Sequence, residues 1–160
     1  MGERVRYDGG HRKQPVLLTA LDGRVEWIAT CPEVELGLGV PRETIQIEEQ
    51  GPLLRLVTSE SQIDLTVRME AWAQERIASL AEKGISGYVF KARSPSCGVK
   101  SVTVTNLEEK VSGLFAAALV RSFPNLPVVE EEDLKTEASC ELFHQRVHSY
   151  HQLILTKVIG

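Results

Sequence analysis

The sequence predicts an α/β fold, with a mainly parallel sheet flanked by helices in a Rossmann-like three-layer arrangement. Short apolar runs alternate with longer stretches of helical periodicity, which is the pattern of strands connected by helices. A short alternating segment adds a small antiparallel hairpin, and the last part of the chain has the pattern of a long amphipathic helix. The chain has 160 residues, of which 42% are hydrophobic, so it can bury one sizeable core.

The first half of the chain predicts a short helix, a strand and the hairpin. Residues 14–21 place apolar side chains on one side of a helix that Asp22-Gly23 ends. Residues 24–30 are expected to form a strand of the main sheet. Residues 44–48 alternate between apolar and polar, as 54–57 do in part, so we expect a hairpin beside the main sheet with one solvated face.

The second half continues the alternation of helices and strands. Residues 64–83 carry an apolar stripe at helical spacing, Asp64 can cap the start, and Gly84 follows the last turn. With the strands at 24–30 and 86–90, this helix would form a parallel strand–helix–strand unit. Further elements are expected as a brief strand at 102–104, a helix at 108–122 and a last strand at 126–129.

The end of the chain differs in character from the rest. The acidic run Glu130-Glu131-Glu132-Asp133 is expected to be the solvated start of a helix. Residues 136–156 then predict a long amphipathic helix, through which a homodimer could form. We therefore divide the chain into one α/β domain at 1–134 and a C-terminal helix or tail at 135–160.

Composition excludes several functional classes. The net charge of −4 argues against a nucleic-acid partner. Three widely spaced cysteines do not suggest a disulfide framework, so a reducing compartment, the cytoplasm, is expected. There is neither a signal peptide nor an apolar run long enough to cross a membrane, so no membrane association is expected.

One cysteine lies in a turn rich in polar residues, residues 91–101, which we call the thiol loop. It follows an apolar strand, and Pro95 and Gly98 enclose Ser96 and Cys97. Lysine and arginine side chains near the thiol favour the thiolate, the form that binds metals or attacks electrophiles. The alternative is a buried, inert cysteine, which is the commonest fate of a free thiol.

A second cysteine follows a strand in the same way. Cys31 directly follows residues 24–30 and precedes Pro32-Glu33. If the two strands are parallel neighbours, Cys31 and Cys97 lie at one edge of the sheet together with Glu33. Two thiols and a carboxylate make a plausible metal site, although no close Cys-x-x-Cys pair of the zinc-finger type occurs.

Two weaker candidates remain. Cys140, His144, His148 and His151 fall on one stripe of the last helix and could bind zinc or copper, the alternative being the polar flank of a docked helix. Near the amino terminus, arginines together with Tyr7 and His11 could hold an anion or orient a ring. The alternative there is a solvated arm.

Three motifs together resemble the domain of unknown function 523 family, which includes the thiouracil desulfidases. They are Arg6-Tyr7-Asp8-Gly9-Gly10-His11; Cys31-Pro32-Glu33-Val34 with Gly37-Leu38 and Pro41-Arg42; and Ser94-Pro95-Ser96-Cys97-Gly98. Their order and spacing agree with the family over roughly residues 2–134. The residues after 140 resemble the segment that follows this domain where a second domain is fused to it.

The resemblance implies an α/β domain that carries a [4Fe–4S] cluster on three cysteines. The open iron would take the sulfur of a thiolated pyrimidine such as 2-thiouracil, and water would replace that sulfur. On this resemblance Cys31 and Cys97 are cluster and metal ligands, and Glu33 is the general acid/base. Ser94 or Ser96 would orient substrate or water. Tyr7, Asp8 and His11 would line the substrate pocket.

The sequence departs from the family pattern at its start. Family members begin with a strand that ends in a Ser-x-Cys-Leu-x-Gly-type turn, and this turn supplies the first cluster cysteine. Met1-Gly2 align with the end of that turn, so the third ligand is expected upstream of Met1, and the cluster would be incomplete without it. The alternative function is a cluster-free relative that binds a small anion or a partner chain.

Overall fold

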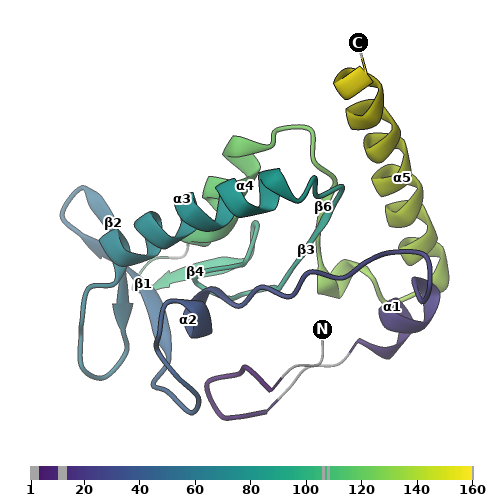
Figure 1. Ribbon diagram of the computed structural model, residues 1–160. Coiled ribbons are helices and arrows are strands. Elements are labelled where there is room, and N and C mark those ends of the chain that lie inside the picture. The colour runs from purple at the N-terminus through teal and green to yellow at the C-terminus, as the bar shows by residue number, and fades with distance from the viewer. Residues whose placement is uncertain (1–3, 11–13, 106, 108, 160) are drawn as a thin grey trace.

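The computed structural model describes residues 4–10, 14–105, 107 and 109–159, and it is a mixed α/β structure (Figure 1). Its sheet is flanked by helices, and a long helix ends the chain. The helices are α1 (Pro15–Ala20), α2 (Pro32–Glu35), α3 (Thr66–Glu82), α4 (Leu114–Ser122) and α5 (Glu137–Ile159), with a 3₁₀ turn η1 (Glu131–Asp133). The strands are β1 (Ile45–Gln50), β2 (Leu53–Thr58), β3 (Tyr88–Phe90), β4 (Val102–Thr105), β5 (Lys110–Val111) and β6 (Val128–Glu130).

The larger sheet is mixed, so the prediction of a mainly parallel sheet is wrong. Its strand order is β2-β1-β4-β5, in which only the β1–β4 pair is parallel. The predicted hairpin forms as β1 and β2, but β1 pairs with β4, so the hairpin is part of this sheet and does not lie beside it. A second sheet consists of the parallel pair β3 and β6. Rossmann-like layering stays a prediction.

Residues 24–30 join neither sheet, contrary to the expected strand and parallel unit, and Arg24 and Val25 still belong to the turn and bend that follow α1. A side chain of α3 binds the end of this segment instead. Arg76 of α3 donates from Nη2 to the Ala29 carbonyl at 2.8 Å and to Thr30 Oγ1 at 2.7 Å. The guanidinium of Arg76 therefore holds this segment in place, whereas we expected hydrogen bonds from a neighbouring strand to do so.

The predicted helix at 108–122 begins only at Leu114. Val111 turns back to pair with Val102 in an antiparallel ladder, which takes the preceding residues out of the helix. Gly113, with extended backbone angles, sits just before the helix, and a Cβ there would lie 2.6 Å from the Ser96 carbonyl carbon. The close approach to the thiol loop therefore requires glycine at this position.

The main core lies between the mixed sheet and helices α3 and α4, which pack on one another over it (Figure 1). Phe115 of α4 is fully buried at its centre, and its ring centroid lies 5.0 Å from that of Trp72 and 5.8 Å from that of Tyr88. A smaller cluster, to which Leu17, Leu21, Cys140 and Phe143 belong, joins α1 to α5. Division of the chain at residue 134 stays a prediction.

No helix in the described part of the chain is both long and apolar enough to span a lipid bilayer.

We predict that Phe115→Ala lowers the free energy of unfolding by about 3–5 kcal/mol, because it leaves a cavity among large aromatic neighbours. Urea denaturation followed by circular dichroism measures this loss. Val67→Ala is the control, since this valine is 69% exposed and its loss should cost within about 0.5 kcal/mol. Equal effects of the two substitutions would contradict the assigned core.

Candidate functional site

The thiol loop is held in a compact turn by its own backbone and by the start of α4. Gly98 N–H donates to the Ser94 carbonyl at 2.7 Å, and Cys97 N–H donates to Ser94 Oγ at 3.3 Å. The first N–H groups of α4 donate to the loop, with Phe115 N–H 3.1 Å from the Ser96 carbonyl oxygen. The helix end thereby finds acceptors in the loop that carries Cys97.

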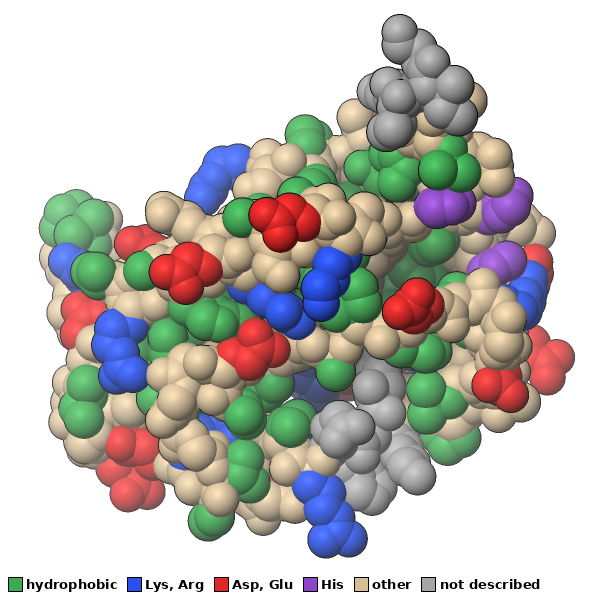
Figure 2. Space-filling view, viewed as in Figure 1, with side chains coloured by type: hydrophobic (Ala, Val, Ile, Leu, Met, Phe, Trp, Pro, Cys, Tyr) green, Lys and Arg blue, Asp and Glu red, His purple; other side chains and the backbone are tan. Residues whose placement is uncertain are grey.

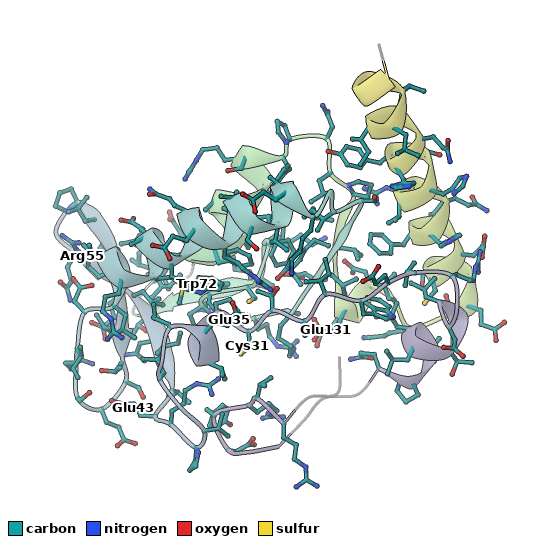
Figure 3. All side chains as sticks on the ribbon, viewed as in Figure 1. Cys31, Glu35, Glu43, Arg55, Trp72 and Glu131 are labelled. Atoms are coloured by element: carbon teal, nitrogen blue, oxygen red, sulfur yellow. The ribbon has the colours of Figure 1, made fainter. Side chains whose placement is uncertain are left out.

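Cys31 precedes the short helix α2, and its position is set by the ion pair of Glu35 with Arg76. Its N–H donates to Glu35 Oε1 at 3.1 Å, and Glu35 Oε2 lies 3.5 Å from Arg76 Nε. Figure 3 shows Cys31 and Glu35 next to each other beneath α3. Since Arg76 also holds the preceding segment, α3 positions the whole turn that presents this thiol.

Glu33 connects the two cysteine-bearing segments. Its Oε1 accepts hydrogen bonds from Ser96 Oγ at 3.0 Å and from Ser94 Oγ at 3.4 Å. Its Oε2 accepts from Arg42 at 3.1 Å (Nε) and 2.6 Å (Nη2). The side chains of Arg42 and Glu33 are only 5% and 17% exposed, so this is a largely desolvated ion pair.

The hydroxyls also reach Cys97. Ser94 Oγ and Ser96 Oγ lie 2.9 Å apart, and Ser96 Oγ can donate to Cys97 Sγ at 3.6 Å. The structure thus brings Glu33, Ser94, Ser96 and Cys97 into one hydrogen-bonded group, which we call the crevice group. A carboxylate in contact with hydroxyls can accept or return a proton at this place.

Both thiols are held in the neutral form by burial, contrary to the expectation that nearby cations favour the thiolate. Burial raises the pKa of Cys97 to about 12, and the negative charge of Glu33 acts in the same direction. Burial also raises the pKa of Cys31. The cations that should have helped, Lys91 and Arg93, are engaged by glutamates instead.

Among the described residues, neither the Asp8 side chain nor the Tyr7 side chain hydrogen-bonds to the crevice group. Asp8 accepts from Gly10 N–H at 2.9 Å and pairs with Arg6 at 3.2 Å, so it organises its own turn. The Tyr7 ring is largely exposed, but its carbonyl accepts from Arg42 N–H at 2.9 Å. His11 lies outside the described residues. A role for these residues in substrate binding stays a prediction.

The metal site proposed on the last helix does not form. Cys140 is buried in the α1–α5 cluster with its Sγ 3.8 Å from the Leu134 carbonyl, whereas His144 contacts Arg24 and His151 contacts Ser86. Figure 2 shows the histidines on the outside of α5. Nowhere in the described ranges do three or more His, Cys, Asp or Glu side chains form a group that could hold a metal ion.

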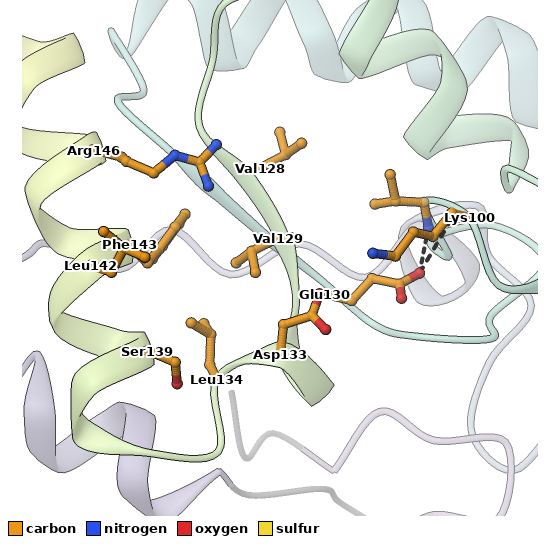
Figure 4. Close-up of a pocket in the computed structure, with 11 residues that line it drawn as sticks. Lys100, Val128, Val129, Glu130, Asp133, Leu134, Ser139, Leu142, Phe143 and Arg146 are labelled. Atoms are coloured by element: carbon orange, nitrogen blue, oxygen red, sulfur yellow. Dashed lines mark hydrogen bonds between the residues drawn. The ribbon is translucent and has the colours of Figure 1, made fainter.

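A cavity of about 350 Å³ lies between β6 and α5 (Figure 4). It meets the thiol loop only at Val99 and Lys100, and none of the crevice group lines it. We place the candidate site at the crevice group because the chemically competent side chains meet there.

Fold and geometry together define a mixed α/β protein with a largely buried carboxylate–hydroxyl–thiol site, formed by the short helix α2 and the thiol loop. A family model described as 2-thiouracil desulfurase matches residues 1–132, and the chain belongs to this family. A solved structure of the [4Fe-4S]-dependent thiouracil desulfidase TudS is similar to the chain, with a TM-score of 0.65 and 31% sequence identity. The match covers 83% of this chain and 86% of that one. No curated protein matches.

Cys31 and Cys97 suit an iron–sulfur cluster in chemistry, since thiolates are its usual ligands. Glu33, two residues after Cys31, is hydrogen-bonded to Ser96, which directly precedes Cys97. Iron ions would supply the positive charge that these buried thiols lack for ionisation. The two cysteines account for two of the three ligands that the family resemblance implies. Cys140, the remaining cysteine of the chain, belongs to the other cluster and does not complete the set.

Arg42 is the site residue to which sequence reasoning assigned no role, although it belongs to one of the recognised motifs. Besides Glu33 it donates to the carbonyls of Gly39 at 2.8 Å and Val5 at 2.9 Å. The sequence did contain a signal for Arg42. Glu33 lies two residues after a cysteine, and a carboxylate that is buried at such a place requires a counter-charge.

We predict that Arg42→Met lowers the free energy of unfolding by about 2–3 kcal/mol, because Glu33 loses its counter-charge in a largely buried place. Adding Glu33→Gln to this variant should recover part of the loss, which a double-mutant cycle by urea denaturation measures.

Arg55→Met is the matched control. Arg55 pairs with Asp64 across 3.8 Å at an exposed position, so its loss should cost less than about 1 kcal/mol. Additivity of the Arg42 and Glu33 substitutions would contradict the coupling.

Proposed function

We propose that the chain removes sulfur from a thiolated nucleobase similar to 2-thiouracil and yields the oxo base and hydrogen sulfide. The observation that carries this proposal is the crevice group, in which a carboxylate bonded to hydroxyls lies beside Cys97. Membership of the 2-thiouracil desulfurase family and the similarity to a thiouracil desulfidase support it.

The reaction is a hydrolysis without net redox change. A water oxygen forms the new bond to the ring carbon, the carbon–sulfur bond breaks, and sulfur leaves with the two protons of the water. A [4Fe–4S] cluster, when bound, supplies a soft Lewis acid for the thiocarbonyl sulfur. Cys31 and Cys97 would hold it together with a third ligand.

In this proposal Glu33 is the general acid/base. Its Oε1 faces the serine hydroxyls, so it can take a proton from water held there and return one to the departing sulfur. Ser94 and Ser96 orient water or substrate through their hydroxyls. Arg42 occupies Oε2 and leaves only Oε1 for this task.

Other features complete the proposal. Asp8, Tyr7 and His11 line the substrate pocket. The cysteines are free of disulfides, which fits the cytoplasm as the compartment.

Leu142 and Leu153 are both exposed and lie eleven positions apart on α5, so they are on one side of the helix. They would pair two chains in a homodimer, and light scattering of Leu142→Glu compared with the unaltered chain tests this.

We predict that Glu33→Gln lowers kcat for 2-thiouracil at least about 100-fold, because the amide cannot accept the proton. Loss of thiouracil absorbance and released sulfide are measured after anaerobic reconstitution with iron and sulfide. Glu43→Gln is the matched control, since this exposed carboxylate bonds Ser61 and should leave kcat unchanged. An unaltered chain that binds iron and releases no sulfide would contradict the proposed activity.

A separate prediction concerns the ligands. Cys31→Ser and Cys97→Ser should each reduce the iron and acid-labile sulfide bound per chain, because each removes a thiolate ligand. Cys140→Ser should not, since its thiol lies in the α1–α5 cluster. Iron binding that is unaffected by the first two substitutions would overturn the ligand assignment.

A further inference from the structure

Consecutive glutamates after β6 bind the beginning of the thiol loop. Glu131, whose side chain is 2% exposed, accepts from Ala92 N–H at 2.5 Å and pairs with the Lys91 ammonium. Glu132 pairs with Arg93 through hydrogen bonds of 2.8 Å and 2.5 Å. The acidic run expected as a solvated helix start is therefore in contact with the loop, and its first two members are buried.

Glu130 binds the other end of the same loop. Its Oε1 accepts from Val99 N–H at 2.8 Å and from Lys100 N–H at 3.4 Å (Figure 4). The same oxygen accepts from Ser101 Oγ at 2.7 Å. The Ser101 hydroxyl oxygen in turn accepts from Arg93 N–H at 2.9 Å. A continuous set of hydrogen bonds thus joins the two ends of the loop through one carboxylate.

The strand pairing explains why these residues meet. β3 and β6 are parallel, with Phe90 opposite Glu130, so the residues that follow each strand leave the sheet at the same edge. A buried carboxylate is tolerated only with several donors, and the loop backbone supplies them. Arg93 has a φ of +60°, an uncommon backbone conformation that the bonds to Glu132 and Ser101 stabilise.

We propose that Glu130 and Glu131 are positioning residues of the site, which act through the backbone of the thiol loop. They set where Ser96 and Cys97 lie relative to Glu33, although neither belongs to the crevice group. The 3.0 Å hydrogen bond from Ser96 to Glu33 depends on this placement, because hydrogen bonds weaken within a few tenths of an ångström. The catalytic consequence rests on the proposed desulfuration, whereas the effect on the loop does not.

The first test is amide hydrogen exchange of the full chain with Glu131→Gln. The amide keeps the shape of the side chain but loses the charge that binds Ala92 N–H and Lys91, so exchange in residues 91–101 should rise about tenfold. Exchange in α3 should stay unchanged. Glu141→Gln removes a glutamate that pairs with Arg24 on the surface and should change neither region.

Ser101→Ala is a milder variant for the case that Glu131→Gln does not fold. It removes the hydroxyl that joins Glu130 to Arg93 N–H and should raise loop exchange in the same direction. Unchanged exchange in the loop would overturn the proposal. An equal rise throughout the chain would also overturn it, because that pattern reports global unfolding.

The second test separates positioning from a purely structural role. In the reconstituted chain both variants should lower kcat for 2-thiouracil about tenfold and leave KM within about twofold, because misplaced reacting groups affect the chemical step. A raised KM with unchanged kcat would overturn the positioning role. If the unaltered chain shows no desulfuration, the proposed function fails, and the exchange result still decides whether the glutamates hold the loop.

Discussion

The site depends on a buried carboxylate that two loops share. One carboxylate oxygen of Glu33 accepts hydrogen bonds from Arg42, and the other accepts hydrogen bonds from the two serines of the thiol loop. Burying a charge is unfavourable unless it is paired and hydrogen-bonded, so the two loops are stable together only in the arrangement that supplies these donors. The pair therefore determines which side of Glu33 remains for chemistry.

The same principle holds the irregular segments elsewhere around the site. Neither residues 24–30 nor residues 91–101 find ladder partners in a sheet. Arg76 instead binds the Ala29 carbonyl, and Glu130 and Glu131 bind backbone N–H groups of the thiol loop. Side-chain charges thus replace strand pairing as the means of positioning Cys31 and Cys97. Because Lys91 and Arg93 of the thiol loop are paired with glutamates, they do not promote ionisation of the thiols.

Much of the fold follows from local patterns. The apolar stripe of α3, the glycine stop at Gly84 with its φ of +62°, and the β1–β2 hairpin were all predicted, because periodicity and turn residues act within a few positions. Sequence reasoning failed where a distant partner decided the outcome. The antiparallel pairing of Val111 with Val102 made the observed helix shorter than the predicted one. The pairing of β1 with β4 brought the antiparallel hairpin into the larger sheet, which is therefore mixed.

The sequence by itself determined the family, through motifs whose order and spacing are specific, and it identified the two cysteines, Glu33 and the two serines as candidates. Local chemistry suffices for this, because residue types and spacing are read directly from the chain. Only the tertiary structure decided that Arg42 neutralises Glu33, that Cys140 belongs to a different core, and that the acidic run holds the thiol loop. Burial and long-range pairing decide these properties, and neither is encoded within a few neighbouring residues.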